Sequence, residues 1–170
     1  MPITYPDGTY SRKGDYPGAE NSENPIKLLN EVKNVTGRTQ SLGNLMATFH
    51  LSDKVDYHAS VSGQLSSSYN LYYGGRTVYD VAENQQGVAE RGHTDFGSWT
   101  TEHYFSYNNS WNKHHLNAVA GASRYYYVTS NDRAGAEGFF DDFFQYNNLG
   151  TGTTPRIPSS GKTENQLNSY

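Results

Sequence analysis

An alternating pattern of apolar and polar side chains runs through the eleven residues from Val55 to Leu65, VDYHASVSGQL. Alternation with a period of two predicts a β-strand that has one apolar and one polar face. Such a strand occurs half-buried in a soluble sandwich, and it also occurs in a membrane barrel with lipid outside and water inside. In a barrel, we expect lipid to face Val55, Tyr57, Ala59, Val61 and Leu65, and the lumen to face Asp56, His58, Ser60 and Gln64.

Similar alternation predicts further strands and joins them as two hairpins. Ser52 to Lys54 separate the first pair of alternating segments, and Asn112 to His114 separate the second pair. Short polar connections between alternating segments are typical of β-hairpins. The last residues, TENQLNSY, read as the beginning of another strand. The four complete strands are expected at residues 44–51, 55–65, 101–111 and 115–128.

Two long polar segments lie between and after these hairpins. Residues 66–98 are expected to form one loop, and a second loop follows Val128 and reaches Lys162. Strands long enough to cross a bilayer, with short turns at one end and long loops at the other, are typical of outer-membrane barrels. The predicted fold class is all-β: an antiparallel meander of about four to five long strands, part of a transmembrane β-barrel with long extracellular loops. Aromatic residues near the short turns fit an interfacial girdle: Phe49, Tyr57, Tyr107 and Trp111.

The chain divides into a lead-in and a barrel region. Residues 1–36 are expected to be loop and lead-in, and residues 37–170 to be a partial β-barrel. Within the lead-in, Pro25 precedes the segment IKLLNEVKN, whose apolar residues have roughly helical spacing. A helical turn and an irregular lead-in both fit this segment.

Composition narrows the classes of function. Only 34% of the 170 residues are apolar, while tyrosine occurs 15 times and glycine 17 times, which favours β-structure with polar loops. The net charge of -4 provides no basic surface for nucleic acid, so no nucleic-acid partner is expected. Cysteine is absent, and no apolar run is long enough for a membrane helix, so any membrane crossing is expected to use strands.

Several motifs follow one another in an order that resembles a known family. They are the Asn24-Pro25 lead-in, the Gly43-Asn44 pair, the strand DYHASVSG and the hairpin YNNSWNKHHLNAVAGAS. Their order and spacing resemble the SusC/RagA-type TonB-linked outer-membrane transporters (TonB-dependent receptors). The resemblance covers roughly residues 20 to 130 and the last few residues.

This resemblance implies a nutrient importer in the bacterial cell outer membrane, with oligosaccharides or peptides as substrates. The implied partners are the lipid bilayer, the rest of the barrel and its plug, TonB, and a SusD-like surface lipoprotein. A signal peptide, TonB box and plug are not recognised in these residues, and a barrel needs at least about eight strands. We therefore expect a segment of a transporter that is incomplete and inactive alone.

Loop aromatics are the candidate ligand-binding residues. Sugar rings and peptide side chains are commonly held by aromatic faces with polar neighbours. The same side chains also fit a structural role, packing the loop against itself or against the lipoprotein. The candidates are Tyr69, Tyr72, Tyr73, Arg76 and Trp99, with Asn70 and Tyr79 nearby.

No catalytic or metal-binding constellation is evident, and no cofactor is expected. His114 and His115 are adjacent on a strand, so their side chains point to opposite faces and do not readily chelate one ion. Asp141, Asp142 and Glu137 lie among phenylalanines and read as a surface insert, not as glycosidase carboxylates. The protein is therefore not expected to be an enzyme.

One alternative from another class of function remains at this point. A soluble carbohydrate-binding β-sandwich module would place the same tyrosines on a binding face. The position of the loops discriminates between the two hypotheses, because a sandwich has no reason to place both long loops at one end.

Overall fold

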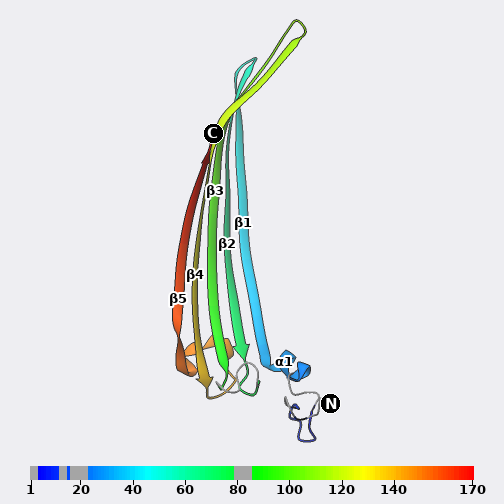
Figure 1. Ribbon diagram of the computed structural model, residues 1–170, viewed down its shortest axis with the longest axis vertical. Coiled ribbons are helices and arrows are strands. Elements are labelled where there is room, and N and C mark those ends of the chain that lie inside the picture. The colour runs from blue at the N-terminus through cyan, green and yellow to red at the C-terminus, as the bar shows by residue number, and fades with distance from the viewer. Residues whose placement is uncertain (1–3, 12–14, 16–22, 79–85) are drawn as a thin grey trace. The chain divides into compact units, whose positions relative to one another are not determined.

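The computed structural model describes residues 4–11, 15, 23–78 and 86–170, and these form one short helix and five long strands. The strands form one sheet in the order β1-β2-β3-β4-β5, which confirms the predicted all-β antiparallel meander (Figure 1). The elements are α1 Pro25–Glu31, β1 Val32–Ser52, β2 Val55–Gly74, β3 Val88–Trp111, β4 His114–Phe139, the 3-10 turns η2 Gln145–Asn147 and η3 Leu149–Thr151, and β5 Gly152–Ser169.

The expected long loops are wrong in extent, because every strand runs further than its alternating segment. Residues 66–74 continue β2 and residues 88–98 belong to β3, so only residues 75–87 connect these strands. The second expected loop likewise contains the end of β4 and most of β5. Backbone pairing does not need an apolar face, so a strand with polar residues on both faces lacks alternation but keeps its hydrogen bonds.

The segment after Asn24 is a helix, one of the two interpretations that the sequence left open. Asn24 caps it, since its side-chain Oδ1 accepts a hydrogen bond from the Ile26 amide at 3.0 Å. Pro25 occupies the first helical position, where its missing N–H costs nothing. Lys27 is buried: its Nζ donates to the Thr77 carbonyl and lies 3.6 Å from a carboxylate oxygen of Glu23.

The chain separates into two compact units, which we call the loop unit and the turn unit. The loop unit contains α1 and both longer connections, 75–87 and 140–151, while the turn unit contains both tight turns. The two longer connections therefore belong to the same unit, as the order of short and long connections predicted. The loop unit is Met1–Gly37, Ser68–His93 and Asp132–Ser160, and the turn unit is Arg38–Ser67, Thr94–Asn131 and Gly161–Tyr170.

Both connections in the turn unit are two residues long. Asp53 and Lys54 link β1 to β2, and Asn112 and Lys113 link β3 to β4. Asn112 has a φ of 55°, a left-handed conformation that asparagine tolerates well and that tight hairpin turns require. These short turns keep β1 with β2, and β3 with β4, as antiparallel neighbours.

The buried apolar side chains described in the structure all lie in the loop unit. Tyr73, Ala89, Ala136 and Phe139 form its small core, in which the Tyr73 and Phe139 rings meet edge to face at 5.7 Å. Val78 and Val88 are also buried there. No buried apolar residue is found among the described residues of the turn unit, so its sheet is two-sided and uncovered.

Candidate functional site

Contacts between neighbouring strands define two faces of the turn unit. On one face the Tyr57 ring stacks on Phe49 at 6.0 Å and lies 5.0 Å from Phe105. On the other face His58 stacks on Tyr104 at 4.4 Å. Tyr57 and His58 are adjacent in β2, so these contacts place odd and even positions of that strand on opposite faces. The sequence predicted this division of residues 55–65 into two faces.

The face of Tyr57 is apolar and exposed. Large side chains that belong to it by strand alternation include Leu45, which is 79% exposed, and Leu65, which is 69% exposed. In a small water-soluble domain such a surface is normally covered. Other exposed members of this face are Phe49, Leu51, Val61, Phe105, Trp111 and Leu116.

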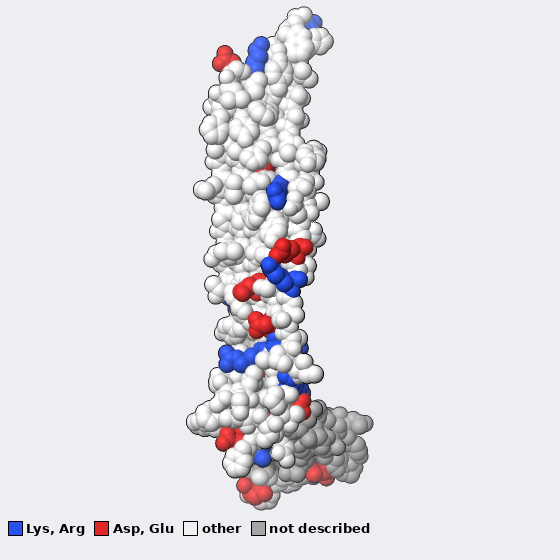
Figure 2. Space-filling model, turned by 90° about the vertical axis from the view of Figure 1, so that its left-hand side faces the viewer, with Lys and Arg blue, Asp and Glu red and all other residues white. Residues whose placement is uncertain are grey.

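The face of His58 is mainly polar, and its groups bond across strands. His58 Nε2 lies 3.1 Å from Ser106 Oγ, and Ser60 Oγ donates to Glu102 at 3.2 Å. Leu42, Met46 and Val119 interrupt this face with exposed apolar side chains. On the surface turned to the viewer in Figure 2, charged side chains form small groups of both signs, with wide uncharged areas between them.

Gly121 makes room for the aromatic stack on the polar face. A Cβ atom at residue 121 would overlap the Cβ atom of Tyr104 and the carbonyl oxygen of His103. Glycine therefore lets the backbone of β4 approach the backbone and Cβ atom of Tyr104 closely, while the Tyr104 ring stacks on His58. Gly37 in the loop unit differs, because there the ring of Tyr69 itself covers the glycine.

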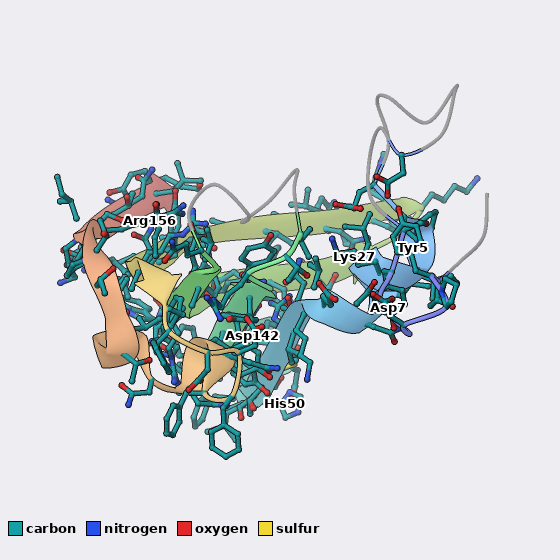
Figure 3. All side chains as sticks on the ribbon, turned by 90° about the horizontal axis from the view of Figure 1, so that it is seen from below. Tyr5, Asp7, Lys27, His50, Asp142 and Arg156 are labelled. Atoms are coloured by element: carbon teal, nitrogen blue, oxygen red, sulfur yellow. The ribbon has the colours of Figure 1, made fainter. Side chains whose placement is uncertain are left out.

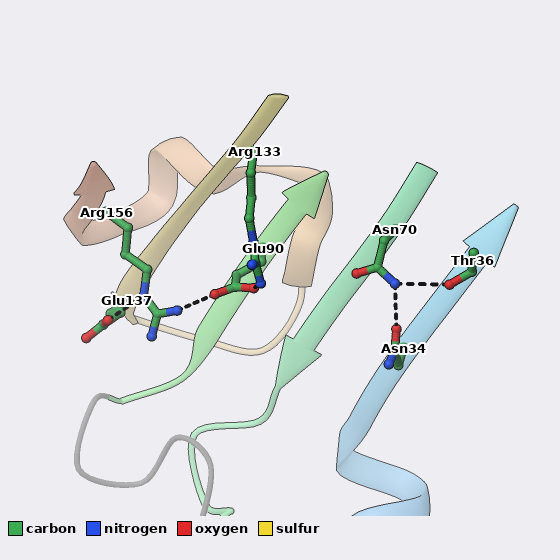
Figure 4. A network of polar contacts seen from close by, with 7 residues as sticks. All are labelled: Asn34, Thr36, Asn70, Glu90, Arg133, Glu137 and Arg156. Atoms are coloured by element: carbon green, nitrogen blue, oxygen red, sulfur yellow. Dashed lines mark hydrogen bonds and ion pairs between the residues drawn. The ribbon is translucent and has the colours of Figure 1, made fainter. Parts of the chain in front are cut away.

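A network of ion pairs links three strands of the loop unit (Figure 4). The Glu90 carboxylate accepts hydrogen bonds from Arg133 and from Arg156, and Arg156 Nε also donates to Glu137 at 2.5 Å. These residues come from β3, β4 and β5. The Glu90 side chain is only 17% exposed, so its interactions are partly shielded from water.

Asn70 forms a second polar group in the loop unit. Its side-chain amide donates to Asn34 Oδ1 and to Thr36 Oγ1, both at 3.0 Å, and so links β2 to β1 (Figure 4). Tyr72 follows Asn70 by two residues in β2 and shares its face. Amide, hydroxyl and charged groups thus form the polar surface of this unit.

Within the loop unit, the predicted ligand residues lie on different faces or in the core. Tyr69 is half-exposed and lines a 490 Å³ groove in the loop unit with Leu71, Arg91, His93, Asp132 and Leu149. Tyr72 lies on the opposite face of β2. Trp99 belongs to the turn unit, and Tyr79 lies outside the described residues. Contact with a ligand stays a prediction for these residues.

Tyr73 and Arg76 hold the connection after β4 in place. The buried Tyr73 hydroxyl donates to Asp142 Oδ1 at 2.6 Å, and the Arg76 backbone amide donates to the same oxygen at 3.2 Å. Asp141 accepts from the Phe143 amide at 2.9 Å. Figure 3 labels Asp142 on this connection, separately from Arg156 on β5. These contacts give both aspartates a structural role.

Sequence reasoning missed the Glu90 network. Glu90 lies in a segment that was expected to be loop, and Arg133, Glu137 and Arg156 lie in the second expected loop. The sequence shows charges of both signs in these segments, since Arg91 follows Glu90 and Asp132 precedes Arg133. The order of these charges does not reveal the pairing, which depends on the register of β3, β4 and β5.

The described residues contain no group of three or more His, Cys, Asp or Glu side chains arranged to hold a metal ion. No helix among them is long and apolar enough to cross a membrane.

Comparison with solved structures identifies a related fold. The chain is similar to the structure of the RagAB peptide transporter, with a TM-score of 0.78 at 16% identity over 94% of this chain. Two structures of the RagAB peptide importer, in the "closed-closed" and "open-open" states, match with a TM-score of 0.72 at 17% and 16% identity, each over 94% of this chain. In all three cases the chain spans 18% of the length of the solved chain. No family model and no curated protein matches the sequence.

Proposed function

We propose that this chain is a segment of the barrel wall of a TonB-linked outer-membrane importer of the SusC/RagA type. The observation that carries the proposal is the exposed apolar face of the turn unit, opposite a polar face on the same strands. Lipid on one side and a water-filled lumen on the other satisfy both faces, and strand pairing satisfies the backbone. The fold shared with the RagAB peptide transporter supports this assignment.

The lengths of the strands agree with a bilayer crossing. In β4 the apolar face extends from Leu116 through Ala118 and Ala120 to Ala122, and a polar residue, Arg124, follows. The ten residue steps from His114 to Arg124, at about 3.4 Å each and a tilt of about 40°, give a height of about 25 Å. That height matches the apolar band of an outer-membrane barrel.

The remaining parts of the assembly follow from the same proposal. The described sheet has two edges, β1 and β5, and neighbouring strands of a complete barrel pair with both of them. A plug, TonB and a SusD-like surface lipoprotein complete the proposed machine in the bacterial outer membrane. Peptides are the favoured substrate class because the similar structures are of a peptide transporter, and oligosaccharides are the alternative.

A soluble carbohydrate-binding sandwich receives less support. A sandwich needs a second sheet packed on the apolar face of the first. The described strands all belong to one sheet, and the apolar face of its turn unit is uncovered.

Cysteine labelling of the intact membrane protein tests the proposal. These 170 residues contain no cysteine, so Val61→Cys and Ser60→Cys each introduce one thiol in them. We expect a water-soluble maleimide to label position 60 and to leave position 61 unlabelled until the membrane is dissolved. Labelling of position 61 in intact membranes, or recovery of the protein in the soluble fraction, would contradict the assignment.

Uptake measurements separate the two substrate classes. Cells that lack the protein should lose import of labelled peptides and keep import of labelled oligosaccharides. The opposite result would support oligosaccharide transport. Loss of neither would contradict a role in import of these compounds.

A further inference from the structure

In β4 the unbroken run of apolar side chains on the apolar face of the turn unit ends at a cluster of aromatic and basic side chains, and Val128 follows this cluster, against Gly97 with Leu65. In β4, Arg124 is the first charged residue after the apolar positions from Leu116 to Ala122. Trp99 of β3 and Tyr126 of β4 lie beside it, with their rings 5.9 Å apart. Tryptophan and tyrosine are enriched at the boundary between membrane and water. We call Arg124, Trp99 and Tyr126 the rim cluster.

Arg124 is held in place without being neutralised. Its Cζ atom lies over the Trp99 ring, 5.3 Å from the ring centroid, and its Nη2 donates to Gln166 Oε1 at 2.8 Å. Among the described residues, no carboxylate forms an ion pair with Arg124. The side chain is exposed, so the N–H groups of Nε and Nη1 remain available to an acceptor.

Lys162, the neighbouring basic residue, differs from Arg124 because it forms an ion pair. Lys162 Nζ lies 2.5 Å from Glu164 Oε1, so its charge is compensated on the same strand. Glu164 also accepts a hydrogen bond from Tyr126 of the rim cluster. The cluster therefore has a fixed guanidinium charge, not joined to a carboxylate by an ion pair among the described residues, at the end of the apolar run of β4. A guanidinium prefers bidentate binding to phosphate or carboxylate oxygens, and its contact with an aromatic ring leaves this edge free.

We propose that the rim cluster binds the phosphate group of a membrane lipid, with the acyl chains of that lipid lying along the apolar face. The proposal rests on the proposed function, because it needs the turn unit to lie in a bilayer. A phospholipid joins an anionic group to long apolar chains. In β4 the apolar positions from Leu116 to Ala122 are likewise followed by a basic residue, Arg124. Anionic headgroups are attracted to basic side chains at the membrane surface.

The test measures lipid retained by the intact protein in detergent by native mass spectrometry. Phosphatidic acid is the probe, and diacylglycerol with the same chains lacks the phosphate. We expect retention of phosphatidic acid to fall about tenfold in Arg124→Gln, the loss of a charge-assisted bond, and to be partly kept in Arg124→Lys. Arg38→Gln is the matched control, since Arg38 is an exposed base of the turn unit that donates to Ser66 at 2.9 Å.

Three outcomes would overturn the inference. They are equal retention of phosphatidic acid by the wild type and Arg124→Gln, equal retention of diacylglycerol and phosphatidic acid, and displacement of the lipid by millimolar inorganic phosphate, which indicates a site for a free anion. Heat-modifiable mobility and the labelling of position 61 are measured on each variant. If the protein inserts correctly but lipid retention does not depend on Arg124, lipid binding by the rim cluster is refuted and the proposed function stands. If the wild type fails to insert into the membrane, the proposed function itself is refuted.

Discussion

The loop unit and the turn unit are built from the same strands, but they use apolar residues in opposite ways. The loop unit buries Tyr73 and Phe139 to 1% exposure in a small core. In the turn unit, large apolar side chains such as Leu45 and Leu65 are exposed on one face of an uncovered sheet. A low apolar content is therefore compatible with a stable fold if one unit takes its apolar environment from lipid.

The ion pairs of the two units also differ in their exposure to water. The loop unit joins β3, β4 and β5 through the partly buried Glu90 carboxylate, whereas the turn unit places an exposed pair, Lys162 and Glu164, along a single strand. Partly shielded ion pairs contribute more than exposed ones, because water and salt screen them less. The loop unit thus resembles a small water-soluble domain, and the turn unit resembles a membrane wall.

The largest expected effect concerns the core of the loop unit. Phe139→Ala removes a buried ring and should lower the free energy of unfolding of this unit by about 3–5 kcal/mol. Hydrogen exchange of the strands around it, residues 88–93 and 132–139, measures the change. Phe140→Ala is the matched control, because Phe140 is 87% exposed, and it should leave exchange unchanged. Equal effects of the two substitutions would show that no such core exists.

The next effect tests the apolar face of the turn unit. Val61→Arg places a charge in the apolar band and should cost about 2–4 kcal/mol, measured by urea unfolding of the inserted protein. Ser60→Arg should cost much less, because residue 60 lies on the polar face beside Glu102. Ile157→Arg, at a 97% exposed position of the loop unit, should change stability by less than about 0.5 kcal/mol. Equal tolerance at residues 60 and 61 would show that the two faces of the turn unit do not differ.

A smaller effect distinguishes the two kinds of ion pair. Glu90→Gln weakens the bonds to Arg133 and Arg156 and should destabilise the loop unit by about 1–2 kcal/mol, with a smaller difference at high salt. The exchange of β3 and β5 amides reports this change. Glu164→Gln, in the exposed pair of the turn unit, should have no measurable effect. If Glu164→Gln costs as much as Glu90→Gln, shielding does not explain the difference between the pairs.

The smallest effect concerns a surface turn of the loop unit. Hydrogen bonds from the Thr9 hydroxyl and from the Thr9 amide lower the pKa of Asp7 below its ordinary value of 3.8. A lowered pKa means that the stabilisation is present above pH 3.8 and is lost as the pH falls through the lowered value. The NMR shift of the Thr9 amide should titrate with a midpoint below 3.8.

Thr9→Ala provides the control for this titration. It removes the hydroxyl and keeps the amide, so the midpoint for Asp7 should move part of the way back toward 3.8. A wild-type midpoint at or above 3.8 would contradict the hydrogen-bonded turn.

The sequence alone determined the part of the fold in which a strand has one apolar and one polar face. Alternation from Val55 to Leu65 predicted the strand and its two faces, and the polar connections Ser52 to Lys54 and Asn112 to His114 predicted the tight turns, which are one residue shorter in the structure. These features are local, since each depends on the period of a strand or on the conformation of a few turn residues.

The tertiary structure decided the extent of the strands and the contacts between them. Residues 66–74 and 88–98 show no sustained alternation, because only a few of their side chains, such as Tyr73 and Ala89, are buried in the small core and most of the others are polar. Their pairing is dictated by the neighbouring strands. The bonds of Glu90 to Arg133 and Arg156 join residues 43 and 66 positions apart. Such pairs depend on register, which is a property of several strands together and is not encoded in any one segment.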